Sequence, residues 1–141
     1  MWTVFDEVNL FCITTNAALT KQSALVMGAG IARQARDRFP GLDLKFGQVI
    51  AKLEQPYGLL VLADYPAEKV AAFQVKQHFR QNANLSLIEK STEMLMGWCS
   101  AHPDATVALN FPGIGHGKLD KGEVLPIIEK LPDQVQVWKY A

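Results

Sequence analysis

The 141-residue sequence has no excess charge of either sign, few cysteines and no long apolar run. Fourteen Lys and Arg balance fourteen Asp and Glu, which argues against a protein that coats duplex DNA or binds membranes through bulk positive charge. No window approaches the roughly 20 apolar residues of a membrane span, and the first residues lack the pattern of a secretory signal. We therefore expect a cytoplasmic protein without membrane association, in which local groups hold any anionic ligand.

The sequence has only two cysteines. Cys12 and Cys99 lie in separate apolar stretches, with no Cys-x-x-Cys pair and no neighbouring histidine cluster. This pattern predicts reduced, buried thiols and no metal site, and we expect no cofactor. Because the chain also lacks a Ser/Gly linker, a low-complexity tract and an internal repeat, we interpret residues 1–141 as a single domain.

Short apolar runs of strand length alternate with helical patterns. The runs are Asn9–Thr14, Tyr57–Ala63, Val70–Gln74, Thr106–Asn110 and Val135–Lys139. Only the last alternates apolar and polar residues, which indicates a strand near an edge, whereas the others are typical of fully buried strands. This organisation predicts an α/β sandwich with a largely parallel or mixed central sheet, and ligands then bind at the carboxyl ends of strands.

Helical spacing predicts four helices. The first two cover about Ile31–Phe39 and Leu42–Leu53, and the third, with capping-box spacing at Ser86 and Glu89, runs to about Ala101. The last carries Val124, Ile127, Ile128 and Leu131 on one face. Because Pro126 cannot donate a backbone hydrogen bond, we expect this helix to begin no earlier than about Glu123, which leaves Asp120 in the preceding loop.

Two glycine-rich loops are candidate ligand sites. Met27-Gly28-Ala29-Gly30-Ile31 opens the first helix, where backbone N–H groups and the helix dipole attract a phosphate. This loop lacks the third glycine of a dinucleotide fingerprint and the Gly-Lys-Ser/Thr of a P-loop, so neither standard nucleotide motif applies. The alternative is that its glycines only make a tight turn and a close helix contact.

The second loop, Gly113-Ile114-Gly115-His116-Gly117, follows the Thr106–Asn110 run. Its three glycines permit left-handed backbone conformations, which form anion-binding nests. Ordering such a loop costs conformational entropy, which favours a bound ligand over the alternative of a flexible surface turn.

Lys76, His78 and Arg80 alternate just after the Val70–Gln74 run. In an extended segment they would point the same way and form a cationic cluster. They are either ordinary solvated charges or a group of which one member reaches into a cleft shared with the glycine loops.

Together these segments resemble the macrodomains, the ADP-ribose-binding α/β/α modules, and within them the branch of the DarG-type DNA ADP-ribosyl glycohydrolases and the related terminal ADP-ribose glycohydrolase. The first glycine loop, with the basic helix ending in Arg38-Phe39-Pro40, resembles the ligand-binding loop of that branch. Val75–Arg80 resembles the segment with its catalytic lysine, and Phe111–Asp120 its second glycine loop. The resemblance extends from about Asn9 to Trp138 and implies a three-layer sandwich with a shortened N-terminal strand.

The resemblance implies a role for each site residue. Gly28–Ile31 and Gly113–Gly117 would clamp the diphosphate and distal ribose, and Lys76 would attack or stabilise the anomeric carbon. Asn16 is either an amide beside the distal ribose or a turn residue. Asp120 is either the acid/base partner of Lys76 or the cap of the last helix.

One feature of the family is missing. Macrodomains usually have a Gly-Asp pair near the N-terminus whose acid binds adenine, and this sequence has none. Either Asp6 substitutes for it or adenine stacks on Phe111 or Phe79.

The resemblance therefore implies a hydrolase that removes ADP-ribose from a DNA base or an acidic side chain. His78 and Arg80, together with the arginines of the first helix, would contact single-stranded DNA, and a cognate ADP-ribosyltransferase would be the natural partner. The alternatives are a non-catalytic ADP-ribose reader and an ADP-ribose 1″-phosphate phosphatase.

Overall fold

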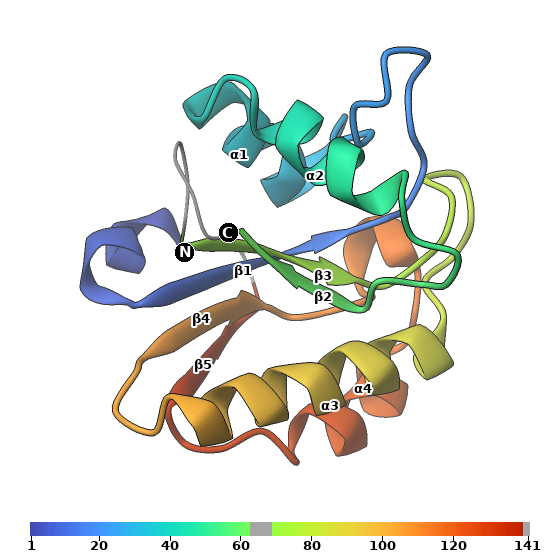
Figure 1. The fold of residues 1–141 in the computed structure, drawn as a ribbon. Coiled ribbons are helices and arrows are strands. Elements are labelled where there is room, and N and C mark those ends of the chain that lie inside the picture. The colour runs from blue at the N-terminus through green and yellow to red at the C-terminus, as the bar shows by residue number, and fades with distance from the viewer. Residues whose placement is uncertain (63–68, 140–141) are drawn as a thin grey trace.

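Five strands form one mixed sheet at the centre of the computed structural model, which describes residues 1–62 and 69–139 and, for His116, the backbone alone (Figure 1). The strand order is β2-β3-β1-β4-β5. Their bounds are Leu10–Thr15 for β1, Leu59–Val61 for β2, Val70–Gln74 for β3, Val107–Asn110 for β4 and Val135–Trp138 for β5. β1 pairs in parallel with β3 and β4, β4 pairs in parallel with β5, and β2 runs antiparallel to β3. The carboxyl ends of β1, β3, β4 and β5 therefore meet at one edge.

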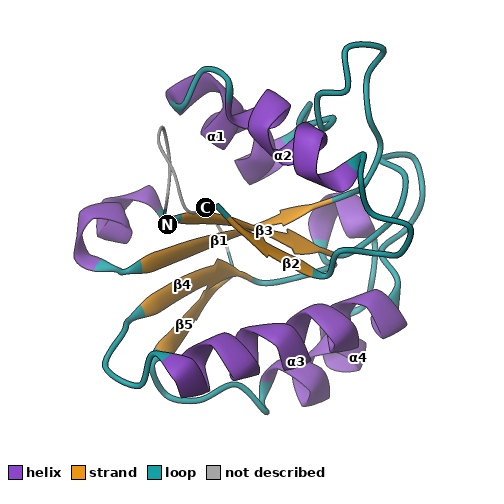
Figure 2. Ribbon diagram, viewed as in Figure 1, coloured by secondary structure: helices purple, strands orange, loops and turns teal. Residues whose placement is uncertain are grey.

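Helices cover both faces of this sheet, which confirms the predicted α/β/α sandwich (Figure 2). The helices α1 (Gly30–Arg38) and α2 (Leu42–Ile50) lie on one face, and α3 (Leu85–Ala101) and α4 (Lys121–Ile128) lie on the other. Two 3-10 helices, η1 (Trp2–Glu7) and η2 (Gly115–Gly117), complete the described elements.

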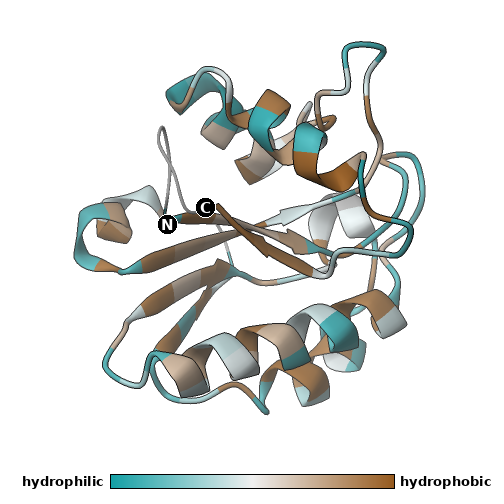
Figure 3. Ribbon diagram, in the orientation of Figure 1, coloured by the Kyte–Doolittle hydropathy of each residue, from teal (hydrophilic) through white to brown (hydrophobic). Residues whose placement is uncertain are grey.

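The two faces of β1 show why its sequence does not alternate. Phe11 and Ile13 pack in the core under α1 and α2, whereas Leu10 and Cys12 pack in the core under α3 and α4. All four residues are almost fully buried, as expected for a strand covered on both sides. In Figure 3, brown residues predominate in β1 and β2, whereas the helices carry both brown and teal residues. β5 lies at the sheet edge and is only half-buried, in line with its alternating sequence.

The N-terminal segment is a 3-10 helix and not a shortened strand. Trp2 and Phe5 are three residues apart and therefore share one face of such a helix. Both rings pack on Phe11 of β1, with centroids 4.5 and 5.1 Å away. This aromatic packing stabilises η1 against the first strand. Asp6 lies in η1 and is exposed.

The start of α3, the end of α2, the bounds of β2 and the start of α4 differ from the sequence predictions. The cap of α3 is Asn84, whose side chain accepts hydrogen bonds from the N–H groups of Ser86 and Leu87, so the capping box predicted at Ser86 is wrong. The helix α2 ends at Ile50, three residues earlier than expected, because the chain tightens there into i to i−3 hydrogen bonds. Of the predicted strand Tyr57–Ala63, residues 59–61 form β2 and Ala63 lies outside the described residues.

The helix α4 begins at Lys121, with Asp120 as its N-cap, so the predicted start at Glu123 is wrong. Pro126 lies inside this helix, where it cannot donate to the carbonyl of Gly122. Gly122 is exposed, so that carbonyl can bond to water, and the helix tolerates the proline in its second turn.

Candidate functional site

A cavity of about 820 Å³ lies at the carboxyl edge of the sheet, where the two glycine loops face each other. It is lined by residues 14–16, 26–32, 75, 76, 79, 110, 111, 113–115, 117 and 139. The structure thus brings together Asn16, both glycine loops and Lys76, which are far apart in the sequence. Strand ends that converge at one edge of a parallel sheet are a usual place for a ligand.

The first glycine loop presents the start of α1 to the cavity. The first N–H groups of a helix have no partner within it, and the N-cap Ala29 offers no side-chain acceptor. Gly30 has φ +58°, a conformation that glycine adopts without strain. Gly28 lines the cavity, and a Cβ atom built there would meet nothing within 4 Å. This arrangement leaves backbone donors open to an anion.

Asn16 anchors the beginning of this loop. Its Nδ2 donates to the carbonyl of Val26 at 3.1 Å, and its Oδ1 accepts from the N–H of Ala18 at 2.9 Å. The hydroxyl of Tyr57 donates to the Asn16 carbonyl at 2.6 Å, and burial raises the pKa of Tyr57, which keeps that hydroxyl neutral. The side chain of Asn16 therefore stabilises the turn after β1, and the residue also lies in the cavity wall.

In the second loop, close packing as well as backbone freedom requires the glycines. Gly113 and Gly115 have φ +81° and +67°. A Cβ atom on Gly113 would lie 2.7 Å from Cδ1 of Ile88, and one on Gly117 would lie 2.9 Å from Cβ of Ala83. The carbonyl of Gly117 also accepts from the N–H of Ala83 at 2.8 Å. The loop is therefore fixed against the start of α3 and is not a loose surface turn.

Lys76 is the buried cation of the site, with 8% of its surface exposed. Its Nζ donates to the carbonyl of Phe79 at 3.2 Å. Burial lowers the pKa of this amine, and the nearby positive charge of Lys118 lowers it further. A larger fraction of the amine is therefore unprotonated near neutral pH than for an ordinary lysine.

The backbone around Lys76 is fixed by Gln74, which is fully buried. The Gln74 Nε2 donates to the carbonyl of Lys76 at 3.3 Å and to Oε1 of Gln77 at 2.6 Å. Its own Oε1 accepts from the N–H of Gly58 at 3.1 Å. These bonds hold the loop that carries Lys76 against the start of β2.

The segment after Lys76 turns, so the expected extended row of three cations is wrong. His78 accepts from the N–H of Arg80 through Nδ1 at 3.1 Å, and its carbonyl accepts from the N–H of Gln81 at 3.0 Å. His78 and Arg80 are exposed and do not belong to the cavity wall. Between them, the ring of Phe79 lines the cavity, stacks on His78 at 4.2 Å and lies 5.5 Å from Cζ of Arg80.

Asp120 is likewise absent from the residues described in the cavity wall. Its Oδ1 accepts from the N–H of Gly122 at 3.0 Å as the cap of α4. The side chain of His116 lies outside the described part of the structure. Asp6, the possible adenine ligand, is not in the wall either.

The site residues predicted from the sequence do not include the polar strand ends in the wall. Asn110 and Thr14 bond twice, from Thr14 N–H to Oδ1 at 2.9 Å and from Nδ2 to Thr14 Oγ1 at 2.8 Å. Thr15 and Lys139 also line the cavity. The available signal was that each lies at or just after the carboxyl end of a parallel strand, where side chains reach the ligand edge.

Metal and membrane features can be stated for residues 1–62 and 69–139. No group of three or more His, Cys, Asp or Glu side chains there could hold a metal ion. None of the helices in that part combines the length and apolar character needed to cross a bilayer. Cys12 and Cys99 are both buried and free, and burial raises the pKa of each thiol.

Comparison with known proteins places this geometry in a fold family. No protein-family model and no curated protein match the sequence. Among solved structures, the macrodomain of Mycobacterium tuberculosis DarG is 23% identical, with a TM-score of 0.73, and the match covers 95% of this chain and 90% of that one. The macrodomain of Thermus aquaticus DarG is 22% identical, with a TM-score of 0.72 over 95% and 89% of the two chains.

Thermosipho africanus DarTG in complex with ADP-ribose is 19% identical, with a TM-score of 0.74. That match covers 95% of this chain but only 38% of the longer one. The chain therefore has the macrodomain fold.

Proposed function

We propose that the cavity binds ADP-ribose and that the protein removes this group from a modified macromolecule, as a hydrolase of the DarG type. The observation that carries the proposal is the placement of a buried lysine between two glycine loops that open backbone donors to one cavity. The solved DarG macrodomains and the DarTG complex with ADP-ribose support the choice of ligand.

The diphosphate is the part of the ligand that the backbone holds. The start of α1 and the loop 113–117 supply N–H groups and a helix dipole, which bind an anion without a cationic side chain. Gly28 and Gly115 leave open space on the cavity side, so the ligand can approach the backbone closely. A molecule of zero net charge can therefore bind a dianion at this position.

Lys76 acts at the distal ribose in this proposal. The unprotonated amine attacks C1″, the bond from C1″ to the macromolecule breaks, and its electron pair leaves with the base nitrogen or the carboxylate oxygen. The sugar opens to a Schiff base, and water then releases ADP-ribose and regenerates the amine. The lowered pKa of Lys76 supplies the unprotonated amine that the first step needs.

A DNA base is the attachment point that the cavity rim favours over an acidic side chain. Phe79 is 42% exposed at the rim, with His78 and Arg80 on either side. An aromatic ring beside a guanidinium is a typical platform for the bases and phosphates of a single strand. The enzyme that attached the ADP-ribose, an ADP-ribosyltransferase, is the partner that such a hydrolase would counteract.

The test combines calorimetry with a hydrolysis assay. We expect the wild type to bind ADP-ribose and to release it from a single-stranded oligonucleotide ADP-ribosylated on thymine. Lys76→Ala should keep the affinity for ADP-ribose but lose turnover by about a hundredfold or more. Gly28→Glu should lose binding, because its carboxylate enters the open space at the diphosphate position, while its thermal unfolding stays like that of the wild type.

Each alternative gives a different result. A reader would bind ADP-ribose without any turnover, and a phosphatase would release phosphate from ADP-ribose 1″-phosphate. If the wild type shows no binding of ADP-ribose, the whole proposal is wrong.

A further inference from the structure

A buried tyrosine joins the end of β1 to the segment that precedes β2. Tyr57 lies two residues before β2 and packs in the core under α1 and α2, with 6% of its surface exposed. Its hydroxyl donates to the carbonyl of Asn16 at 2.6 Å and also bonds to Oγ1 of Thr15. A carbonyl can only accept, and the tyrosine has a single hydrogen to give, so Thr15 donates to the Tyr57 oxygen. These hydrogen bonds therefore run from Thr15 through Tyr57 to the Asn16 carbonyl.

The carbonyl of Asn16 takes no part in the pairing of the strands. The parallel pairing of β1 with β3 continues past the end of β3, where the N–H of Val75 donates to the carbonyl of Thr15 at 2.9 Å. One step further, the N–H of Ala17 donates to the carbonyl of Gln77, also at 2.9 Å. Asn16 lies between the two bonded residues of its chain and is itself buried. Without the tyrosine hydroxyl, its carbonyl would be a buried acceptor that no strand satisfies.

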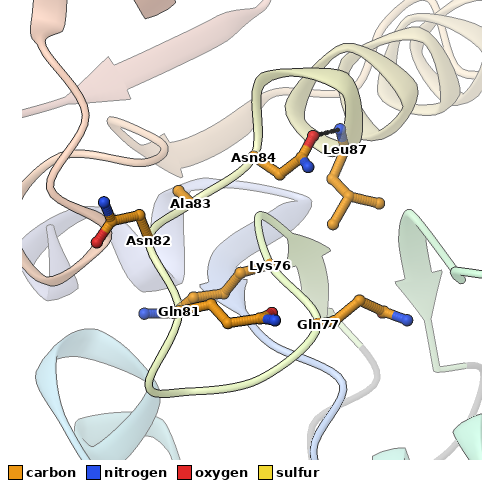
Figure 4. Close-up of a pocket in the computed structure, with 7 residues that line it drawn as sticks. All are labelled: Lys76, Gln77, Gln81, Asn82, Ala83, Asn84 and Leu87. Carbon is orange, nitrogen blue, oxygen red and sulfur yellow. Dashed lines mark hydrogen bonds between the residues drawn. The ribbon is translucent and has the colours of Figure 1, made fainter.

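Asn16 and Lys76 lie on the two segments that this pairing joins. Both residues line the larger cavity. Lys76 and Gln77 point in opposite directions on their loop, as successive residues of an extended chain do (Figure 4). A rotation of the peptide after Asn16 would therefore move Asn16 relative to the loop that carries the Lys76 amine.

The segment that carries Tyr57 is itself fixed. The N–H of Gly58 donates to Oε1 of Gln74 at 3.1 Å, and its carbonyl accepts from the N–H of Gln74 at 2.7 Å. Oγ of Ser91 on α3 donates to the same carbonyl at 3.0 Å. Gly58 has φ +67°, and a Cβ atom there would clash with Sδ of Met94. The tyrosine hydroxyl is thus held at a defined place relative to β3 and α3.

We propose that Tyr57 is a positioning residue, which fixes Asn16 and the start of the first glycine loop relative to Lys76 through the Asn16 carbonyl. This inference rests on the proposed function, which places the distal ribose beside Lys76. Tyr57 is not among the residues of the cavity wall, so it acts through Asn16 and not by contact with the substrate. A misplacement of about 1 Å near the reacting groups can cost about a hundredfold in rate.

The test is Tyr57→Phe, which keeps the ring in the core and removes only the hydroxyl. We expect kcat for release of ADP-ribose from the thymine-modified oligonucleotide to fall about tenfold or more. The pH midpoint of kcat should stay that of the wild type, because the surroundings of the Lys76 amine do not change. Hydrogen exchange of the Ala18 amide, which donates to Oδ1 of Asn16, should become faster relative to the rest of the chain.

Binding is measured separately by calorimetry. Free ADP-ribose is titrated into each protein, and the modified oligonucleotide is titrated into the Lys76→Met background, which stops turnover. Tyr57→Phe should change both affinities by less than about threefold, because backbone donors hold the diphosphate. A loss in kcat with little loss in affinity is the result expected for a positioning residue.

Ile128→Val is the matched control for stability. It removes one methyl group from the core under α3 and α4, on the other face of the sheet, and so destabilises the protein without touching the Tyr57 hydrogen bonds. All proteins are assayed well below their unfolding midpoints. The control should keep the wild-type kcat and the wild-type relative exchange of Ala18.

The proposal is overturned if Tyr57→Phe keeps both kcat and the exchange of Ala18, or if Ile128→Val loses as much turnover. A shifted pH midpoint in Tyr57→Phe would also overturn it, since the hydroxyl would then act on the amine and not on Asn16. A wild type that binds no ADP-ribose would overturn the proposed function instead, and the exchange of Ala18 would still decide whether Tyr57 fixes Asn16.

Discussion

Lys76 is the residue on which the proposed chemistry depends, and two effects act on its amine. Burial is the larger and disfavours the charged form, and the positive charge of Lys118 acts in the same direction. Its Nζ donates to the carbonyl of Phe79, a neutral acceptor that compensates only part of the lost hydration. Both causes lower the pKa of Lys76, so they favour a nucleophilic amine.

We predict that Lys118→Gln raises the pKa of Lys76, because it removes the neighbouring positive charge. The value should stay below that of an ordinary lysine, since burial remains. Titration followed by NMR of lysines labelled at Cε measures this directly, with Lys130→Gln, an exposed position after α4, as the control. An unchanged pKa of Lys76 in Lys118→Gln would show that the two amines do not interact.

The same shift has a consequence for stability. Because the pKa of Lys76 is lower in the folded protein, the unfolded chain binds more protons between the two pKa values, so this group makes stability rise with pH across that window. Lys118→Gln brings the folded-state pKa of Lys76 closer to its unfolded-state pKa, so the free energy of unfolding should rise less with pH.

Single residues of the site differ in how far the sequence could predict them. Lys76 and the glycines were predictable because each belongs to a short local motif. Asn110 was not, because its role depends on pairing with Thr14 across a separation of 96 residues. Asn16 was predictable as a turn residue, but only the folded loop shows that its side chain joins Val26 to Ala18.

At the scale of elements, buried strands and amphipathic helices could be predicted from periodicity, and their ends could not. The N-cap of α3 is Asn84 and not the predicted Ser86, and α4 begins two residues before the start predicted from Pro126. Local sequence offers several capping residues close together, and tertiary packing selects among them. The aromatic packing that makes residues 2–7 a 3-10 helix is also a tertiary effect.

Asp120 has two candidate roles, as the N-cap of α4 and as the acid/base partner of Lys76. Its carboxylate caps α4 and lies outside the cavity wall, which favours the structural role over that of acid/base partner. We predict that Asp120→Ala destabilises the protein by about 1 kcal/mol, as loss of an N-cap does, and that Asp120→Asn keeps both stability and turnover, since an amide oxygen can cap equally well. Chemical denaturation and the hydrolysis assay measure the two properties.

These variants separate the two roles. If Asp120→Asn unfolds like the wild type but loses turnover, the carboxylate is needed for the chemistry and the acid/base role is correct.

The whole molecule has zero net charge, yet its cationic side chains are unevenly distributed around the site. Lys76 and Lys139 line the cavity, and Arg80 stands at its rim. On α1, by contrast, Arg33 and Arg36 both lie within 4.0 Å of Asp37, which offsets part of their charge. Arg80 is therefore a stronger candidate for contact with a nucleic-acid strand than the α1 arginines that the sequence also suggested.

Salt dependence tests this distribution. The logarithm of single-strand affinity falls with the logarithm of salt concentration by about 0.7 for each phosphate neutralised. We predict that the Lys76→Met protein binds the thymine-modified oligonucleotide with a shallow slope of log affinity against log salt concentration between about 50 and 200 mM salt. Because Arg80 is a main contact in this proposal, adding Arg80→Gln should reduce that slope by about 0.7. Free ADP-ribose should give the same affinity in both proteins, because backbone donors hold its diphosphate. Tight binding of an unmodified oligonucleotide with a steep slope would instead mean that the surface binds DNA without regard to ADP-ribose, against what the balanced charge indicates.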